Sequence, residues 1–175
     1  MSYLSYKTQH LPSESEDTDI WFAAKNGNIR LLERCSEDND YFEEYLNEVH
    51  LFEDDFYTPL QIAIAHHRIE TASFLIEQGA ELDCTLANGD TLLHMTVKYQ
   101  MPRIAYELLE LKENVDTANC LGQTPLYRAV WDGNIKFIKL FVKYRADPNA
   151  KAKNYSTPLS IAMGWENMDV VKCMQ

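Results

Sequence analysis

The residues of this chain whose types could carry chemistry are a histidine pair, an aspartate pair and four cysteines. His66 and His67 are adjacent, and adjacent side chains on a helix point apart, so without a cysteine or carboxylate at ligand spacing they do not predict a metal site. Asp54 and Asp55 lie in a stretch typical of a solvated loop tip. The cysteines include no Cys-x-x-Cys pair, which favours free thiols in a reducing compartment; they are Cys35, Cys84, Cys120 and Cys173.

Motifs that mark common catalytic sites are also missing from the sequence. It contains no Gly-rich phosphate loop, no His-Glu-x-x-His and no Gly-x-Ser-x-Gly. We therefore expect no enzyme activity, no cofactor and no metal, and a function that depends on surface contacts.

A short motif that would position such a surface recurs along the chain. Its copies begin at Thr58, Thr91, Thr124 and Thr157, and each step between them is 33 residues. Three of these threonines precede a proline, so Thr can cap a helix while Pro occupies its first turn. A break such as Gly133 and a second apolar helical stripe follow. One such helix pair cannot bury its own apolar face, so the units are expected to stack as a repeat array.

The Thr-Pro-Leu-x-x-Ala core at residues 124–129 and the helix ending Gly79-Ala80 resemble ankyrin repeats. The resemblance covers about residues 18–175. It implies an all-α fold, an ankyrin-repeat solenoid of about five helix-turn-helix units with short hairpin loops. The units are expected at 17–35 with an acidic insert at 36–55, and then at 56–88, 89–121, 122–154 and 155–175, the last one incomplete.

Two segments depart from the repeat. Residues 1–16 are polar and acidic with nothing to bury, so a flexible tail is expected. In the insert, apolar residues at helical spacing predict a lengthened second helix or a short extra helix packed on the first two repeats; they are Tyr41, Phe42, Tyr45, Leu46 and Val49. The alternative is a docking element specific to this repeat.

Charge is distributed unevenly along the 175 residues. Residues 12–57 hold 14 Asp and Glu against 3 Lys and Arg, which accounts for the whole net charge of −11, whereas residues 128–153 hold seven Lys and Arg against two Asp. The acidic total excludes a nucleic-acid binder, because the chain would repel phosphate. No apolar run is long enough to span a bilayer, so no membrane partner is expected.

The C-terminal repeat has a further feature. Val170, Val171 and Met174 are expected to form an apolar edge without a capping repeat, which favours further domains of the same longer chain beyond Gln175. The alternative is that another chain covers this edge.

The resemblance also implies where a partner would dock, namely at the hairpin tips and the exposed face of the first helices. Tyr99, Trp131 and Trp165 occupy slots that ordinary repeats fill with small or polar residues, and large aromatics there are typical of binding hot spots. The alternative is that they cover neighbouring repeats. The full candidate set is Tyr99, Trp131, Trp165, Lys98, Asp132, His66, Tyr57, Asp90 and Gln123.

These observations predict a non-catalytic interaction module, an adaptor or scaffold, that binds another protein. One alternative is an inhibitor-type regulator similar to the inhibitors of Rel transcription factors, or a host-directed viral or bacterial effector. Another is the substrate-recruiting arm of a larger enzyme such as a ubiquitin ligase or a methyltransferase. A cytoplasmic location is expected, with the nucleus, or the host cytosol for an effector, as alternatives.

Overall fold

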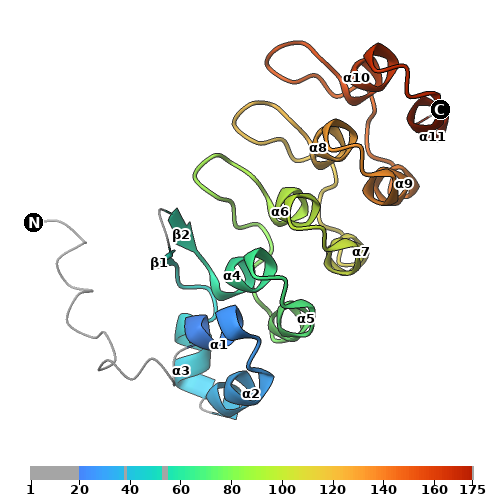
Figure 1. Cartoon of the computed structure of the whole chain (residues 1–175). Helices are drawn as coiled ribbons and strands as arrows, with labels where there is room; N and C mark the ends of the chain where they lie inside the picture. The colour runs from blue at the N-terminus through green and yellow to red at the C-terminus, as the bar shows by residue number, and fades with distance from the viewer. Residues whose placement is uncertain (1–19, 38, 53–54, 175) are drawn as a thin grey trace, which may run out of the picture.

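The chain forms a curved stack of helix pairs. The computed structural model describes residues 20–37, 39–52 and 55–174, and the predicted tail at 1–16 lies outside them. Five helices form an inner row: α1 (Ile20–Asn26), α4 (Pro59–Ala65), α6 (Leu92–Lys98), α8 (Pro125–Trp131) and α10 (Pro158–Gly164). Their partners form an outer row: α2 (Ile29–Glu37), α5 (Ile69–Glu77), α7 (Pro102–Glu110), α9 (Ile135–Lys143) and α11 (Met168–Cys173). Long loops, here called fingers, project beside the inner row at 78–91, 111–124 and 144–157 (Figure 1).

The threonines begin the inner helices as predicted. The side chain of Thr58 accepts from the backbone N–H of Gln61 at 3.3 Å, and Thr124 accepts from Tyr127 at 3.2 Å. Proline follows each of these threonines in the first helical turn, where its missing N–H leaves no bond unmade. Helix α7 likewise accommodates Pro102 in its first turn.

The core runs without interruption through the stack. Leu60, Leu93 and Leu126, one from each of three successive inner helices, are completely buried. On the outer row, Phe137 and Phe141 are also buried, with ring centroids 5.8 Å apart. Each helix pair therefore buries its apolar face against its neighbours.

The backbone of the second, third and fourth repeats adopts a left-handed conformation at three equivalent positions, and the first and last repeats do so at the end of the inner helix. At the ends of two inner helices, Gly27 and Gly133 take this conformation with φ of 74° and 65°. Residues without glycine's freedom take the same conformation at equivalent sites, namely His67, Gln100, Lys112, Arg145, Tyr155 and Glu166. Because such a residue costs of the order of 1–3 kcal/mol, the stack must impose the conformation on the sequence.

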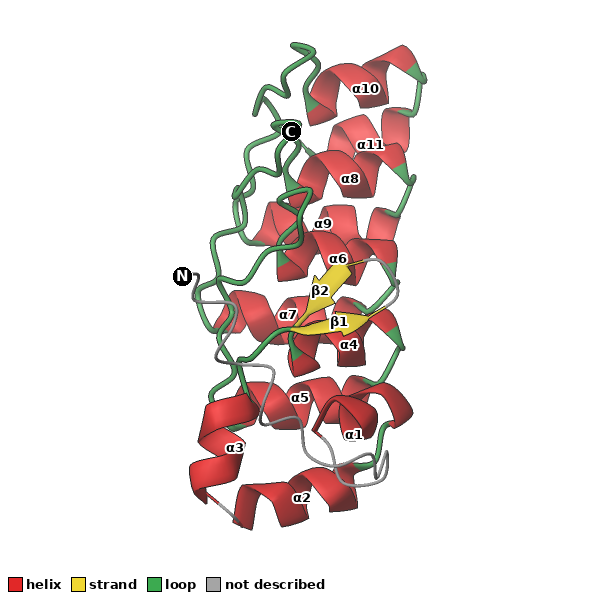
Figure 2. Cartoon of the chain, turned by 90° about the vertical axis from the view of Figure 1, so that its left-hand side faces the viewer, coloured by secondary structure: helices red, strands yellow, loops and turns green. Residues whose placement is uncertain are grey.

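The acidic insert differs from its prediction. A short extra helix, α3 (Asn39–Tyr45), is present, but a two-stranded antiparallel hairpin of β1 (His50–Phe52) and β2 (Asp55–Tyr57) follows it. The hairpin lies on the finger side of the stack and contacts α4 (Figure 2). The assignment of Val49 to a buried helical face was wrong, since Val49 is exposed and lies outside the helix. The β-branched, aliphatic and aromatic residues around it favour a strand.

The prediction that these residues of the last repeat form an exposed apolar edge was also wrong. Val170, Val171 and Met174 are all buried, because α11 turns them towards the stack. The exposed large apolar side chains in the described part of this repeat are those of Tyr155, Met163, Trp165 and Met168.

The third residue of helices α6 and α8 links each of these repeats to the next one. His94 accepts from the Thr91 N–H at 3.2 Å through Nδ1, so Nε2 carries the proton and donates to the Gln123 carbonyl oxygen at 2.9 Å. One repeat later, the Tyr127 hydroxyl lies 3.0 Å from the hydroxyl of Ser156. One repeat earlier, Gln61 accepts from the Thr58 N–H at 2.9 Å, but its buried Nε2 has no partner among the described residues.

Replacing Gln61 with His should supply the missing link. By analogy with His94, the imidazole would donate to the next finger and remove a buried unpaired donor. We expect Gln61→His to raise the free energy of unfolding by about 1 kcal/mol in urea denaturation, and the reverse change His94→Gln to lower it by about as much. A loss of stability in Gln61→His would contradict this account of the inter-repeat link.

His94 should also make stability depend on pH. Burial lowers its pKa below the usual 6.5, so the unfolded chain takes up a proton before the folded chain does. Stability that is present above pH 6.5 is therefore lost as the pH falls below that value, by up to about 1.4 kcal/mol per pH unit. Urea denaturation across this range should show the stability advantage of the parent over His94→Gln shrinking as the pH falls. A constant difference would mean that His94 is protonated equally in both states.

Candidate functional site

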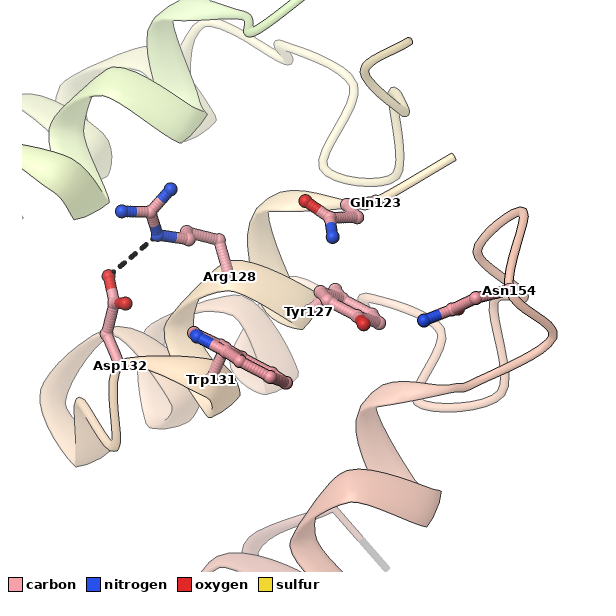
Figure 3. A pocket seen from close by; sticks show the side chains of 6 residues that line it. All are labelled: Gln123, Tyr127, Arg128, Trp131, Asp132 and Asn154. Atoms are coloured by element: carbon pink, nitrogen blue, oxygen red, sulfur yellow. Dashed lines mark hydrogen bonds and ion pairs between the residues drawn. The ribbon is translucent and has the colours of Figure 1, made fainter. Parts of the chain in front are cut away.

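A pocket opens between helix α8 and two fingers. Its volume is about 320 Å³, and its wall combines the exposed end of the helix with the finger bases (Figure 3). The residues that line it are Gln123, Tyr127, Arg128, Trp131, Asp132 and Asn154. Three of them, Gln123, Trp131 and Asp132, belong to the surface predicted from sequence.

The polar wall of the pocket is held in place by local hydrogen bonds. Arg128 donates from Nε to the Asp132 carboxylate at 2.9 Å, across one turn at the end of α8. Tyr127 points towards the finger that carries Asn154, and the Asn154 side-chain oxygen accepts from the Ser156 hydroxyl at 2.6 Å. Both Arg128 and Asp132 remain accessible to solvent, so this exposed ion pair orients the guanidinium more than it stabilises the fold.

Two tryptophans form an exposed aromatic pair beside the pocket. Trp131 is the last residue of α8, and Trp165 directly follows α10. Their ring centroids are 5.4 Å apart with the planes inclined by 54°. Trp131 is 56% exposed and Trp165 is 50% exposed. Large exposed aromatics grouped in this way are typical of interaction sites rather than of a solvated surface.

Tyr99, the third aromatic of the predicted row, lies in a different environment. It is half-buried against the core, and its ring meets that of His67 edge to face at 5.9 Å. The exposed Lys98 places its ammonium nitrogen 5.0 Å from the Tyr99 centroid. The structure thus brings Trp131 and Trp165 together, while Tyr99 contacts its own neighbours.

The other predicted residues are divided between surface and interior. His66 and Tyr57 are half-buried, and Tyr57 packs against the core. Asp90 is only 8% exposed, and its carboxylate accepts from the side-chain amides of Asn88 at 2.9 Å and Asn119 at 2.8 Å. Asp90 therefore ties two fingers together and is not part of the surface proposed below.

Several exposed apolar residues of the last two repeats were not in the predicted set. Tyr155 is 85% exposed at the last finger, next to Asn154. Leu121, Met163 and Met168 are also exposed apolar residues of the same two repeats. Tyr127 and Arg128 were missed because they lie within the helix motif, where a structural role is the ordinary expectation. Tyr155 could have been identified from the sequence, because it is a large aromatic residue at a finger position that is expected to face solvent.

The described residues show little that could support catalysis. They contain no group of three or more His, Cys, Asp or Glu side chains placed to hold a metal ion. None of the four cysteines, all within the described residues, forms a disulfide, and burial raises the pKa of the Cys84 thiol to about 11, which makes it a poor nucleophile at neutral pH. No helix among these residues combines the length and apolar character needed to cross a membrane.

Comparison with known proteins gives a consistent picture of the family. Residues 70–152 match the profile of ankyrin repeats (3 copies). The chain is 32% identical over 127 residues to an ankyrin repeat protein of fowlpox virus (strain NVSL), a match that covers 69% of this chain and 37% of the viral protein. It is 25% identical over 134 residues to the nuclear factor NF-kappa-B p105 subunit of Gallus gallus, covering 74% of this chain and 14% of that protein.

A further relative is the palmitoyltransferase AKR1 of Lachancea kluyveri, 27% identical over 106 residues, covering 58% of this chain and 14% of that enzyme. The matches thus span well under half of each of these three relatives. The repeated helix pairs, the fingers and the profile match agree, and the chain is an ankyrin repeat protein.

Proposed function

We propose that this chain is a non-catalytic adaptor or scaffold that binds a partner protein through the fourth and fifth repeats. The observation that carries the proposal is the pair Trp131 and Trp165, each at least half exposed and in contact with the other. Ankyrin repeats are protein–protein interaction modules, and the exposed tryptophan pair supports docking of the partner on these two repeats.

Binding at this pair is physically favourable because the two tryptophan side chains expose apolar surface to solvent. A partner side chain packed across the exposed faces of the two rings would remove that area from solvent. Buried aromatic anchors of this kind are worth 2 kcal/mol or more at the centre of an interface. The pocket beside the rings supplies polar groups that fix the orientation of the partner. Gln123 and Asn154 offer side-chain amides suited to a peptide backbone, and Arg128 offers a guanidinium.

The proposal predicts that binding, but not folding, depends on the tryptophans. A Trp131→Ala/Trp165→Ala variant should capture the partner from cytosolic extract at least about 30-fold less well than the parent, as expected for a loss of 2 kcal/mol. The matched control is Leu111→Ala/Ile135→Ala, which removes an exposed apolar side chain just after α7 and another at the start of α9 and should keep the partner. Equal retention by the parent and the tryptophan variant, both with cooperative thermal unfolding, would contradict the proposed surface.

A second candidate function is an inhibitor-type regulator of the kind that controls Rel factors, or a host-directed effector. Similarity to the fowlpox virus protein and to the p105 subunit supports it. Such a chain would act in the cytoplasm, in the nucleus or in the host cytosol. Direct titration with a purified Rel-factor dimer distinguishes the two candidates, since a general adaptor would not bind it.

A third arrangement places the same repeats as the recruiting arm of a larger enzyme, as a ubiquitin ligase or methyltransferase would use them. The match to a palmitoyltransferase, which covers 14% of that enzyme, is in keeping with an ankyrin segment inside a longer catalytic protein. In this arrangement the Trp131 and Trp165 surface would hold the substrate protein.

A further inference from the structure

Helix α9 carries a row of lysines on the outer face of the stack. Lys136, Lys139 and Lys143 are all exposed, whereas Phe137 and Phe141 of the same helix are buried. At 3.6 residues per turn, the three lysines fall within about 60° of one another around the helix axis. They form a single line, here called the lysine stripe, on the outer row, and the fingers project from the other side of the stack (Figure 1).

The charge of the lysine stripe is not neutralised by neighbouring side chains. Residues 133–146 hold four Lys or Arg and no Asp or Glu. In the part of the chain that the structure describes, none of the three lysines lies within ion-pair distance of a carboxylate. The carboxylates of the adjacent helix α7 have other partners, since Glu107 pairs with Arg103 at 3.2 Å and Glu110 accepts from the Tyr144 hydroxyl. The stripe is therefore available to a negatively charged partner.

Two tyrosines border the C-terminal end of the stripe. The Lys143 ammonium nitrogen lies 5.4 Å from the ring centroids of both Tyr106 and Tyr144. The two rings meet edge to face at 6.3 Å, and Tyr106 is 42% exposed. Contact with the rings orients the last ammonium group of the stripe and sets an aromatic surface beside it. The outer face thus combines unpaired positive charge with an exposed ring that a partner could cover.

The spacing of the lysines indicates which kind of segment fits them. Along the axis of α9 they are separated by about 4.5 Å and about 6 Å, at a rise of 1.5 Å per residue. Acidic residues three and four positions apart on a second helix have the same two separations, whereas alternate residues of an extended strand are about 6.6 Å apart. The net charge of −11 repels a long polyanion such as RNA more strongly than a short segment with few charges. An acidic helix therefore fits the stripe best.

We propose that the lysine stripe of α9 binds an acidic amphipathic helix of a partner protein. Asp or Glu side chains at positions i, i+3 or i+4, and i+7 of that helix pair with the lysines of the stripe. An apolar residue one turn further along the partner helix packs on the Tyr106 ring. The chain then has two docking surfaces of different chemistry, one at the tryptophan pair and one on the outer row.

NMR titration of the isotope-labelled chain with synthetic helical peptides tests the proposal at low salt. The probe is an alanine- and glutamine-based peptide of about 20 residues, long enough to be helical, with Glu at i, i+3, i+4 and i+7 and Leu at i+11. The control peptide has the same composition, with its Glu residues distributed around the helix. The probe should shift amide signals of α9 and of α7 around Tyr106. It should bind at least about threefold more tightly than the control peptide, and more weakly as salt rises.

Charge reversal on the stripe should remove this binding. Lys136→Glu/Lys139→Glu should weaken the affinity for the probe at least about tenfold, because two attractions become repulsions. The matched control is Lys151→Glu/Lys153→Glu, which reverses two exposed lysines of the last finger and should change the affinity no more than about twofold. The tryptophan variant should keep the parent affinity, which separates this site from the tryptophan surface.

The proposal is overturned if the probe shifts no α9 signals, if the two peptides bind equally, or if the stripe variant loses no more affinity than the finger variant. Single-stranded RNA and vesicles that contain phosphatidylserine cover the other anionic partners. If either binds through α9 more tightly than the probe peptide, the stripe serves a nucleic acid or a membrane surface instead.

Discussion

The close packing of each finger on the next is the constraint on which the rest of the structure depends. The Cys120 N–H donates to the Asn88 carbonyl oxygen at 3.0 Å, and one repeat later the Lys153 N–H donates to the Leu121 carbonyl oxygen at 2.9 Å. A Cβ atom on Gly89 would lie 2.8 Å from the Cys120 nitrogen, closer than real Cβ atoms approach. Only glycine fits there. The hydrogen bond between neighbouring fingers can recur only if each finger begins the same number of residues after the previous one. The 33-residue period is thus a packing requirement.

This constraint also places the candidate surface. Because the repeats stack in register, residues one repeat apart along the inner row lie side by side. Trp131 and Trp165 meet because one ends its inner helix and the other follows the next inner helix, 34 residues later. The same stacking sets the fingers bearing Gln123 and Asn154 against helix α8 and so forms the pocket wall. Surface chemistry can therefore vary from repeat to repeat while the stack remains the same.

The parts of the structure that repeat could be predicted from the sequence, and the parts that occur once could not. Thr58 and Thr124 cap their helices as expected, because capping depends on local chemistry. The hairpin was missed because helical spacing and strand alternation overlap over so few residues, and Val49 satisfied both patterns. Asp90 was taken for a surface residue, although it occupies a finger base where the neighbouring finger supplies Asn119 as its partner. Such contacts between repeats leave no local signal in the chain.

The central claim is that Trp131 and Trp165 serve recognition and do not hold the repeats together. Urea denaturation of Trp131→Ala/Trp165→Ala beside Phe141→Ala tests it most directly, since Phe141 is completely buried in the same part of the stack. The account predicts that the tryptophan variant loses about 1 kcal/mol of unfolding free energy or less, whereas Phe141→Ala loses about 3–5 kcal/mol. A loss in the tryptophan variant as large as that of Phe141→Ala would show that the pair is part of the core.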